Sequence, residues 1–90
     1  MTGSPLNRSA LQLCDLPKGI AATVESVEDL GPADRVAGRL RDLGFVNGEQ
    51  VRVVARGPIG ADPLLVQIGY TRFALRRAEA ARVRVHPIAG

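Results

Sequence analysis

The stretch RDLGFVNGEQVRVV, residues 41–54, contains the end of one regular element, a turn and the start of another. Gly44 is suited to end a helix, because glycine adopts the left-handed backbone conformation without steric cost. Asn47 and Gly48 both tolerate positive φ and form a strong turn pair. The valines and arginines that follow alternate, which is typical of a strand with one buried face. The stretch therefore predicts a helix that runs through a tight turn into a strand.

The helix is predicted just upstream, over about residues 32–43. Its apolar residues recur at the spacing of one helix face: Val36, Leu40 and Leu43. Pro32 suits the first helical position, where its missing N–H costs nothing. Asp34 suits the first turn, where a negative charge meets the helix dipole favourably. Gly38 indicates either a close approach by another backbone or a helix-weakening residue that is merely tolerated.

Short strands account for most of the remaining chain. They are predicted over residues 20–28, 50–56, 64–68, 71–75 and 82–86, with a loop over 57–63 and one helical turn over 76–81. In the second strand we expect Val51, Val53 and Ala55 to face inward, and Arg52 and Arg56 to face outward. About five short strands with one inserted helix predict a mainly β fold. A small barrel is expected, because closure removes the exposed edges of such a sheet.

Length and composition predict one small cytoplasmic domain. The chain has 90 residues, so we expect a loose tail over residues 1–9 and one domain over 10–87. No segment approaches the roughly 20 apolar residues of a membrane span. The single cysteine, Cys14, cannot form an internal disulfide, which agrees with a reducing compartment. The net charge is +3, and ten of the twelve basic residues lie from Arg35 onward. This asymmetry indicates either an acidic partner or a solubilising surface.

Motifs for chemistry are sparse. Cys14 and His86 are the only cysteine and histidine, and their presence alone does not make a catalytic pair. His86 could form a weak, adventitious metal site if the fold brought Glu79 or Asp62 close to it, but a tight site needs more ligands. The loop over residues 57–63 has no phosphate-binding pattern. We therefore expect no enzymatic activity and no tightly bound cofactor.

Nucleic-acid binding is the main physical alternative. An outward-facing basic set is expected on the strands and beside them: Arg52, Arg56, Arg72, Arg76, Arg77, Arg82 and Arg84. Such a set would bind phosphate in a salt-dependent way. Single-strand binders also need exposed aromatics for stacking. Phe45 and Phe73 are expected to be buried, which leaves Tyr70 and makes nucleic acid the weaker hypothesis.

A protein partner could be recognised by exposed residues at turns and on strand faces. The candidate contact residues are Leu16, Pro17, Lys18, Arg52, Leu65, Tyr70 and Arg72. The competing interpretation is that the apolar members pack against the tail or are scattered surface residues. We also expect Arg39 to pair with a carboxylate, either Asp42 or Glu79.

Four segments in order make the chain resemble the ferrous iron transport protein A (FeoA) family. They are DLPKG (15–19), RLRDLGFVNGEQVRVV (39–54), PIGADP (58–63) and ALRRAEAARVRV (74–85). The resemblance runs from about Leu11 to Val85. It implies an SH3-like β-barrel with an inserted helix, similar to the C-terminal domains of iron-dependent repressors. Ala61 departs from the family pattern, which often has a second glycine or a shorter loop there.

The resemblance also implies a function. A member of this family is expected to be a cytoplasmic accessory protein that binds and modulates FeoB, the membrane transporter for ferrous iron. The alternatives are a small basic barrel that binds nucleic acid and a protein that binds Fe²⁺ or another transition metal weakly. Unpaired sheet edges leave a homodimer open as well.

Overall fold

Six strands and three short helices make up the computed structural model, which describes residues 10–60 and 62–88. The strands are β1 (Leu11–Gln12), β2 (Ala21–Val27), β3 (Gln50–Ile59), β4 (Asp62–Ile68), β5 (Thr71–Leu75) and β6 (Val83–Pro87). The helices are the 3-10 turn η1 (Leu13–Asp15), α2 (Arg35–Leu43) and α3 (Arg77–Ala80). The tail predicted over residues 1–9 lies outside the described residues. In the described part of the chain, no helix has the length and apolar character of a bilayer span.

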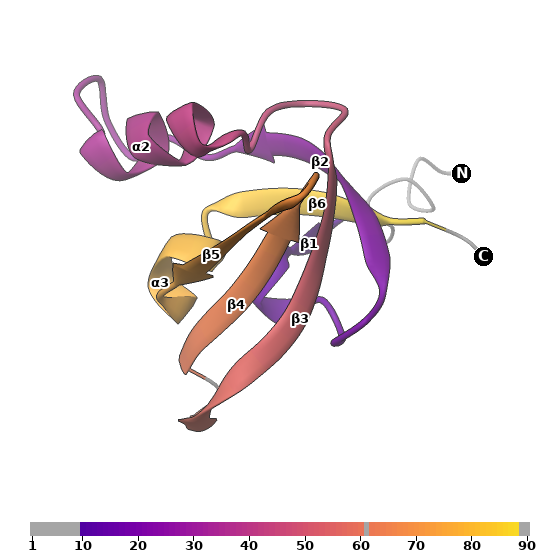
Figure 1. The fold of residues 1–90 in the computed structure, drawn as a ribbon. Helices are drawn as coiled ribbons and strands as arrows, with labels where there is room; N and C mark the ends of the chain where they lie inside the picture. Colours follow the sequence, from indigo (N-terminus) through magenta and orange to yellow (C-terminus); the bar gives the residue numbers. More distant parts are fainter. Residues whose placement is uncertain (1–9, 61, 89–90) are drawn as a thin grey trace, which may run out of the picture.

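All six strands belong to one antiparallel sheet, in the order β1-β6-β2-β3-β4-β5. The sheet is strongly curved around one apolar core, with α2 next to the upper end of β2 and α3 beyond the end of β5 (Figure 1). This mainly β architecture confirms the predicted fold class. One strand more than the predicted five is present, because two residues of the segment before η1 pair with β6.

Aliphatic residues fill the core, as the low aromatic content requires. The largest side chains without exposed surface are Leu13, Leu16, Leu40, Phe45, Leu64 and Leu75, with valines from β2, β3, β4 and β6 between them. Phe45 is confirmed as a core residue, and its ring centroid lies 6.3 Å from that of the half-buried Phe73. Among the described residues, the buried core contains no polar or charged residue.

Helix α2 begins later than predicted. Asp34 is its N-cap, and its Oδ1 accepts hydrogen bonds from the backbone N–H groups of Val36 (3.0 Å) and Ala37 (3.1 Å). Pro32 therefore lies in the preceding turn, because its fixed φ permits a helix start but the Asp34 carboxylate satisfies the free N–H groups. The other carboxylate oxygen accepts from the Leu30 N–H and from the Arg82 guanidinium.

Helix α2 ends where the sequence predicted. Gly44 adopts φ 114°, and its N–H donates to the Arg41 carbonyl oxygen at 3.0 Å. The Phe45 N–H donates to the Leu40 carbonyl oxygen at 3.1 Å, which completes a Schellman motif. This pair of bonds turns the chain so that Phe45 enters the core. Of the two interpretations of Gly38, the close backbone approach is wrong, since a Cβ built there meets no atom within 4 Å.

A β-bulge divides β3 into two halves. Before the bulge, Val53 pairs with Val66, and after it Ala55 pairs with Leu65, so Val54 is the extra residue. A one-residue slip moves every later side chain to the opposite face of the sheet. The prediction that Ala55 faces inward beside Val53 is therefore wrong.

The same bulge reverses Arg56, which the sequence placed on the outside. Arg56 pairs with the fully buried Leu64, on the inner face. Its terminal nitrogens donate to the carbonyl oxygens of Cys14 (3.2 Å) and Leu16 (2.6 Å). Arg56 therefore ties the segment around η1 to β3. The expectation of an outward-facing Arg56 is wrong.

The loop predicted over residues 57–63 is largely part of a hairpin, because β3 extends to Ile59 and β4 starts at Asp62. Glycine is required at position 57, where the backbones of β3 and β4 approach closely. A Cβ built on Gly57 would lie 2.4 Å from the Asp62 carbonyl oxygen, so any other residue would force the backbone apart. The remaining element ends lie within one residue of the predicted ones, which is inside the usual uncertainty of such boundaries.

Candidate partner-binding surface

One row of residues crosses the outer face of four neighbouring strands. In the sheet register, Ala21 of β2 lies opposite Arg52 of β3, Arg52 opposite Gln67 of β4, and Gln67 opposite Arg72 of β5. We call Arg52, Gln67 and Arg72 the outer row. Strand neighbours lie about 4.8 Å apart, so the backbones of the two arginines are roughly 10 Å apart. The fold therefore brings together two candidate contact residues that are distant in sequence.

Gln67 sets the position of Arg72. The Arg72 Nε donates to the Gln67 Oε1 at 3.2 Å, and the Gln67 Nε2 donates to the Gly69 carbonyl oxygen at 3.0 Å. Arg72 is thus held without using either terminal nitrogen of its guanidinium. A fork of two N–H-bearing nitrogens in a fixed plane matches a carboxylate or phosphate in a bidentate way.

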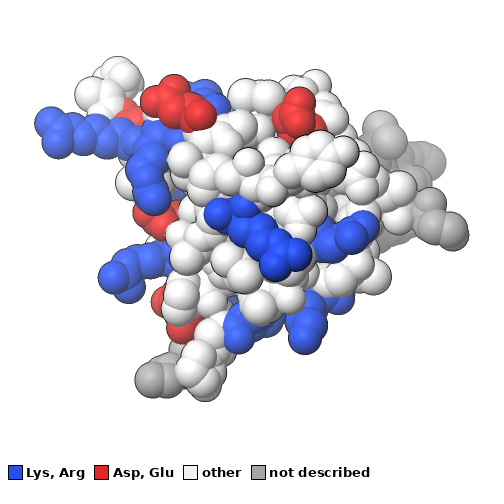
Figure 2. Space-filling model, viewed as in Figure 1, with Lys and Arg blue, Asp and Glu red and all other residues white. Residues whose placement is uncertain are grey.

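A cavity of about 320 Å³ lies along this row. Its lining residues are Gln50, Val51, Arg52, Gln67, Gly69 and Tyr70. Tyr70, in the turn between β4 and β5, is fully exposed, which agrees with its prediction as a surface residue. Among the described residues that line it there is a cationic side chain and no carboxylate. Figure 2 shows Lys and Arg in the middle and lower part of the view, over the face crossed by β3 and β4, and a further group of Lys and Arg at the left margin, where Asp and Glu lie beside them.

The other candidate contact residues lie in two places. Pro17 and Lys18 are exposed in the turn before β2, and the next residue, Gly19, donates its N–H to the Val53 carbonyl oxygen at 2.9 Å. This bond sets the turn beside the β3 end of the outer row. Leu65 is half-buried and pairs with the exposed Ala74, so it lies on the outer face as expected.

Leu16 cannot belong to this surface. Its side chain has no exposed area, and its carbonyl oxygen accepts a hydrogen bond from Arg56. The expectation that Leu16 is exposed beside Pro17 is therefore wrong. The turn at Pro17 suggested a surface position, but the chain buries Leu16 before it turns.

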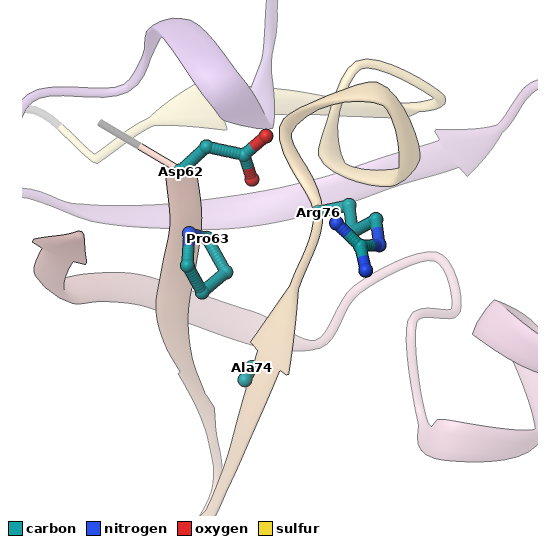
Figure 3. Close-up of a pocket in the computed structure, with 4 residues that line it drawn as sticks. All are labelled: Asp62, Pro63, Ala74 and Arg76. Atoms are coloured by element: carbon teal, nitrogen blue, oxygen red, sulfur yellow. The ribbon is translucent and has the colours of Figure 1, made fainter. Parts of the chain in front are cut away.

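A second cavity, of about 470 Å³, was not foreseen from the sequence. Asp62, Pro63, Ala74 and Arg76 line it, and Figure 3 shows them along the start of β4 and the end of β5. The Asp62 Oδ1 accepts a hydrogen bond from the Arg77 N–H at 3.0 Å, so this carboxylate already serves the start of α3. The walls of this cavity come from two segments that are more than ten residues apart in the sequence. The periodicity of the sequence does not predict that these segments lie together.

In the part of the chain that the structure describes, His86 has one carboxylate neighbour that could share a metal ion with it. The His86 Nε2 lies 3.4 Å from the Glu25 Oε2, and both side chains are well exposed. Neither carboxylate that was considered from the sequence takes this place, because Glu79 pairs with Arg39 at 2.8 Å and Asp62 binds Arg77. Among residues 10–60 and 62–88 there is no group of three or more metal-ligating side chains. Two ligands do not fit a resident metal ion.

Two arginines of the predicted basic set have structural partners instead. Arg56 binds the carbonyl groups near η1, and Arg82 pairs with Asp34 in a largely buried contact. Of the two carboxylates expected for Arg39, Asp42 and Glu79, the partner is Glu79. The same Glu79 carboxylate accepts a hydrogen bond from the Arg76 N–H at the start of α3. The basic surface is therefore smaller than the sequence indicated, which weakens the case for a phosphate backbone as ligand.

Comparisons with known proteins agree with this geometry. The FeoA domain model matches residues 11–87. A Stenotrophomonas maltophilia FeoA structure, solved with zinc, shares 60% identity over 83% of this chain and 88% of that chain, with a TM-score of 0.77. A role as a bacterial ferrous iron transport activating factor has been suggested for that protein.

More distant structures show the same fold. The Chlorobium tepidum FeoA protein shares 39% identity over 89% of this chain and 72% of that chain, with a TM-score of 0.74. A manganese-dependent transcriptional repressor matches 88% of this chain and 42% of its own, at 22% identity and a TM-score of 0.76, which shows likeness of fold alone. No protein of curated function matches the chain in sequence. The chain belongs to the FeoA domain family.

Proposed function

We propose that this protein is a non-enzymatic accessory protein of ferrous iron uptake, which binds FeoB at the cytoplasmic face of the membrane and modulates its activity. The observation that carries the proposal is the family match over residues 11–87, which includes nearly every described residue. The role suggested for the S. maltophilia relative points in the same direction.

The contacts of the family-motif residues support a role in binding rather than in chemistry. Gly44 and Phe45 close a helix, Asp62 accepts a hydrogen bond from the N–H of Arg77 at the start of α3, and Glu79 joins α2 to α3. Residues that the fold uses in this way are not available for a reaction, so function must lie on the surface. The exposed part of that surface offers Pro17, Lys18, the outer row, Leu65 and Tyr70 as contact residues.

The test is uptake of radioactive ferrous iron by cells grown under iron limitation. We expect deletion of the gene to lower the initial uptake rate, and re-expression of the wild-type chain to restore it. A second strain that lacks FeoB serves as the control, since deletion of the accessory protein should have no further effect there. Unchanged uptake after deletion in the FeoB-containing strain would sink the proposal.

A further inference from the structure

The outer-face cavity beside β3, β4 and β5 has features of a built receptor for carboxylates. One wall contains Arg52, and Arg72 lies across Gln67 from it in the sheet register. Between the two arginines, the Gln67 side-chain amide accepts a hydrogen bond from Arg72 and donates one to the Gly69 carbonyl oxygen. A side chain held by a neighbour loses less conformational freedom on binding. Gln67 and Arg72 are therefore held in place before any ligand arrives.

We propose that the cavity lined by Arg52, Gln67 and Tyr70, together with Arg72, binds an acidic peptide segment of a protein partner. The inference deepens the proposed function, because it names the chemistry by which this chain recognises the transporter. One acidic side chain is received by the fork of Arg72 and a second by Arg52. The peptide backbone or an apolar neighbour packs on the fully exposed ring of Tyr70.

Charge complementarity favours this occupant over others. The cavity lining has an arginine, two glutamines and a tyrosine but no carboxylate, so an acidic segment meets no like charge there. A proline-rich peptide would need an aromatic-lined groove, and Tyr70 is the single aromatic residue of this lining. Nucleic acid would need several stacking rings. A membrane surface is recognised by a cluster of several Lys and Arg side chains, whereas this site has Arg52 in the lining and the oriented guanidinium of Arg72 beside it.

The test uses variants that separate geometry from charge. Gln67→Met keeps the net charge and the side-chain length but removes the amide that holds Arg72. Arg72→Lys also keeps the charge but removes the planar fork and the Nε donor. Arg84→Gln is the matched control, because Arg84 is exposed on β6 and lies opposite Ser26, well along β2 from the outer row. It lowers the net charge without touching the cavity.

The measurement is an NMR titration of the ¹⁵N-labelled full chain with a hexaglutamate peptide, and with hexaglutamine as the neutral comparison. We expect saturable shifts of the amides at residues 50–52 and 67–72. The Kd should rise roughly three- to tenfold in Gln67→Met and about tenfold in Arg72→Lys, as for loss of one charge-assisted hydrogen bond. The Kd of Arg84→Gln should stay within about twofold of wild type.

Three results would overturn the inference. Diffuse electrostatic attraction would make Arg84→Gln weaken binding at least as much as Gln67→Met. Shifts of the same amides by phosphatidylglycerol vesicles or a single-stranded oligonucleotide, but not by hexaglutamate, would assign the face to a membrane or to nucleic acid. Absence of saturable peptide binding in a folded wild-type sample would show that the cavity is not a peptide-binding site.

Binding of solubilised FeoB is measured in parallel. FeoB binding that ignores Gln67→Met removes this inference alone, whereas no FeoB binding by wild type removes the proposed function.

Discussion

The two halves of β3 use the same residue type in opposite ways. Arg52, before the bulge at Val54, is exposed in the outer row. Arg56, after the bulge, lies on the inner face and donates to two backbone carbonyls near η1. In a regular strand, residues four positions apart share one face, so the single extra residue accounts for the whole difference. The first half is thus free to meet a partner, while the second half holds the fold together.

The largest difference between the two halves should appear in stability. Replacing Arg56 by Met removes both donors and leaves the carbonyl groups of Cys14 and Leu16 without them. We expect Arg56→Met to lower the free energy of unfolding by about 2–3 kcal/mol. The matched Arg52→Met should stay within about 0.5 kcal/mol of wild type. Urea denaturation followed by circular dichroism measures both, and equal losses would contradict the division of β3.

Gly57 provides the next test of the second half. An alanine Cβ at this position would collide with the backbone of Asp62, and backbone cannot move aside as a flexible side chain can. We expect Gly57→Ala to cost about 2 kcal/mol of stability. Gly38→Ala is the control, because its Cβ meets open space within a helix and should add about 0.5–1 kcal/mol. If both variants had the same thermal stability as wild type, the close backbone approach at Gly57 would be refuted.

Access to the Cys14 thiol reports on the contact between Arg56 and η1. Cys14 is 5% exposed, and Arg56 donates to its carbonyl oxygen, so local opening of this segment controls labelling. We expect Arg56→Met to speed labelling by a thiol reagent about thirtyfold or more, in line with its expected loss of stability. Arg52→Met should label at the wild-type rate. Equal rates in all three proteins would show that Arg56 does not hold the segment.

The smallest expected effect is a dependence of stability on pH through the same thiol. Burial, followed by the charge of Asp15, raises the pKa of Cys14 above its ordinary value of 9.0. The unfolded thiol therefore ionises first, so its contribution is complete at neutral pH and falls as the pH rises through the ordinary value towards the folded one. Wild type should lose more stability than Cys14→Ala between neutral pH and pH about 10. The reverse order would contradict the burial of the thiol.

The sequence predicted those features that local chemistry controls. The end of α2 depends on Gly44 and Phe45, which are adjacent and whose hydrogen bonds reach back only to Arg41 and Leu40. The exposed position of Tyr70 follows from its place in a tight turn. The start of α2 was predicted less well, because Pro32 and Asp34 favour different first residues of the helix. In the structure the Asp34 carboxylate caps the helix, and Pro32 lies before it.

The features that the sequence did not predict depend on contacts between distant segments. No periodic pattern marks the bulge at Val54, because valine suits either face of a strand and the slip is visible only in the pairing with β4. Arg56 was therefore misplaced, and Leu16, which the chain buries before the turn at Pro17, accepts a hydrogen bond from it. The outer row likewise depends on the register of β3, β4 and β5. Its two arginines were proposed as contact residues, whereas Gln67 and its hydrogen bonds were not.

The most direct test of the central claim is binding of the purified protein to detergent-solubilised FeoB from the same organism. We would use biolayer interferometry at about 150 mM salt, where the Debye length is about 8 Å. The comparison is between wild type, the Arg52→Glu/Arg72→Glu double variant and Arg84→Glu. The account predicts saturable binding by wild type and by Arg84→Glu, and at least tenfold weaker binding by the double variant. Equal binding by all three would contradict the claim that the outer row meets the transporter.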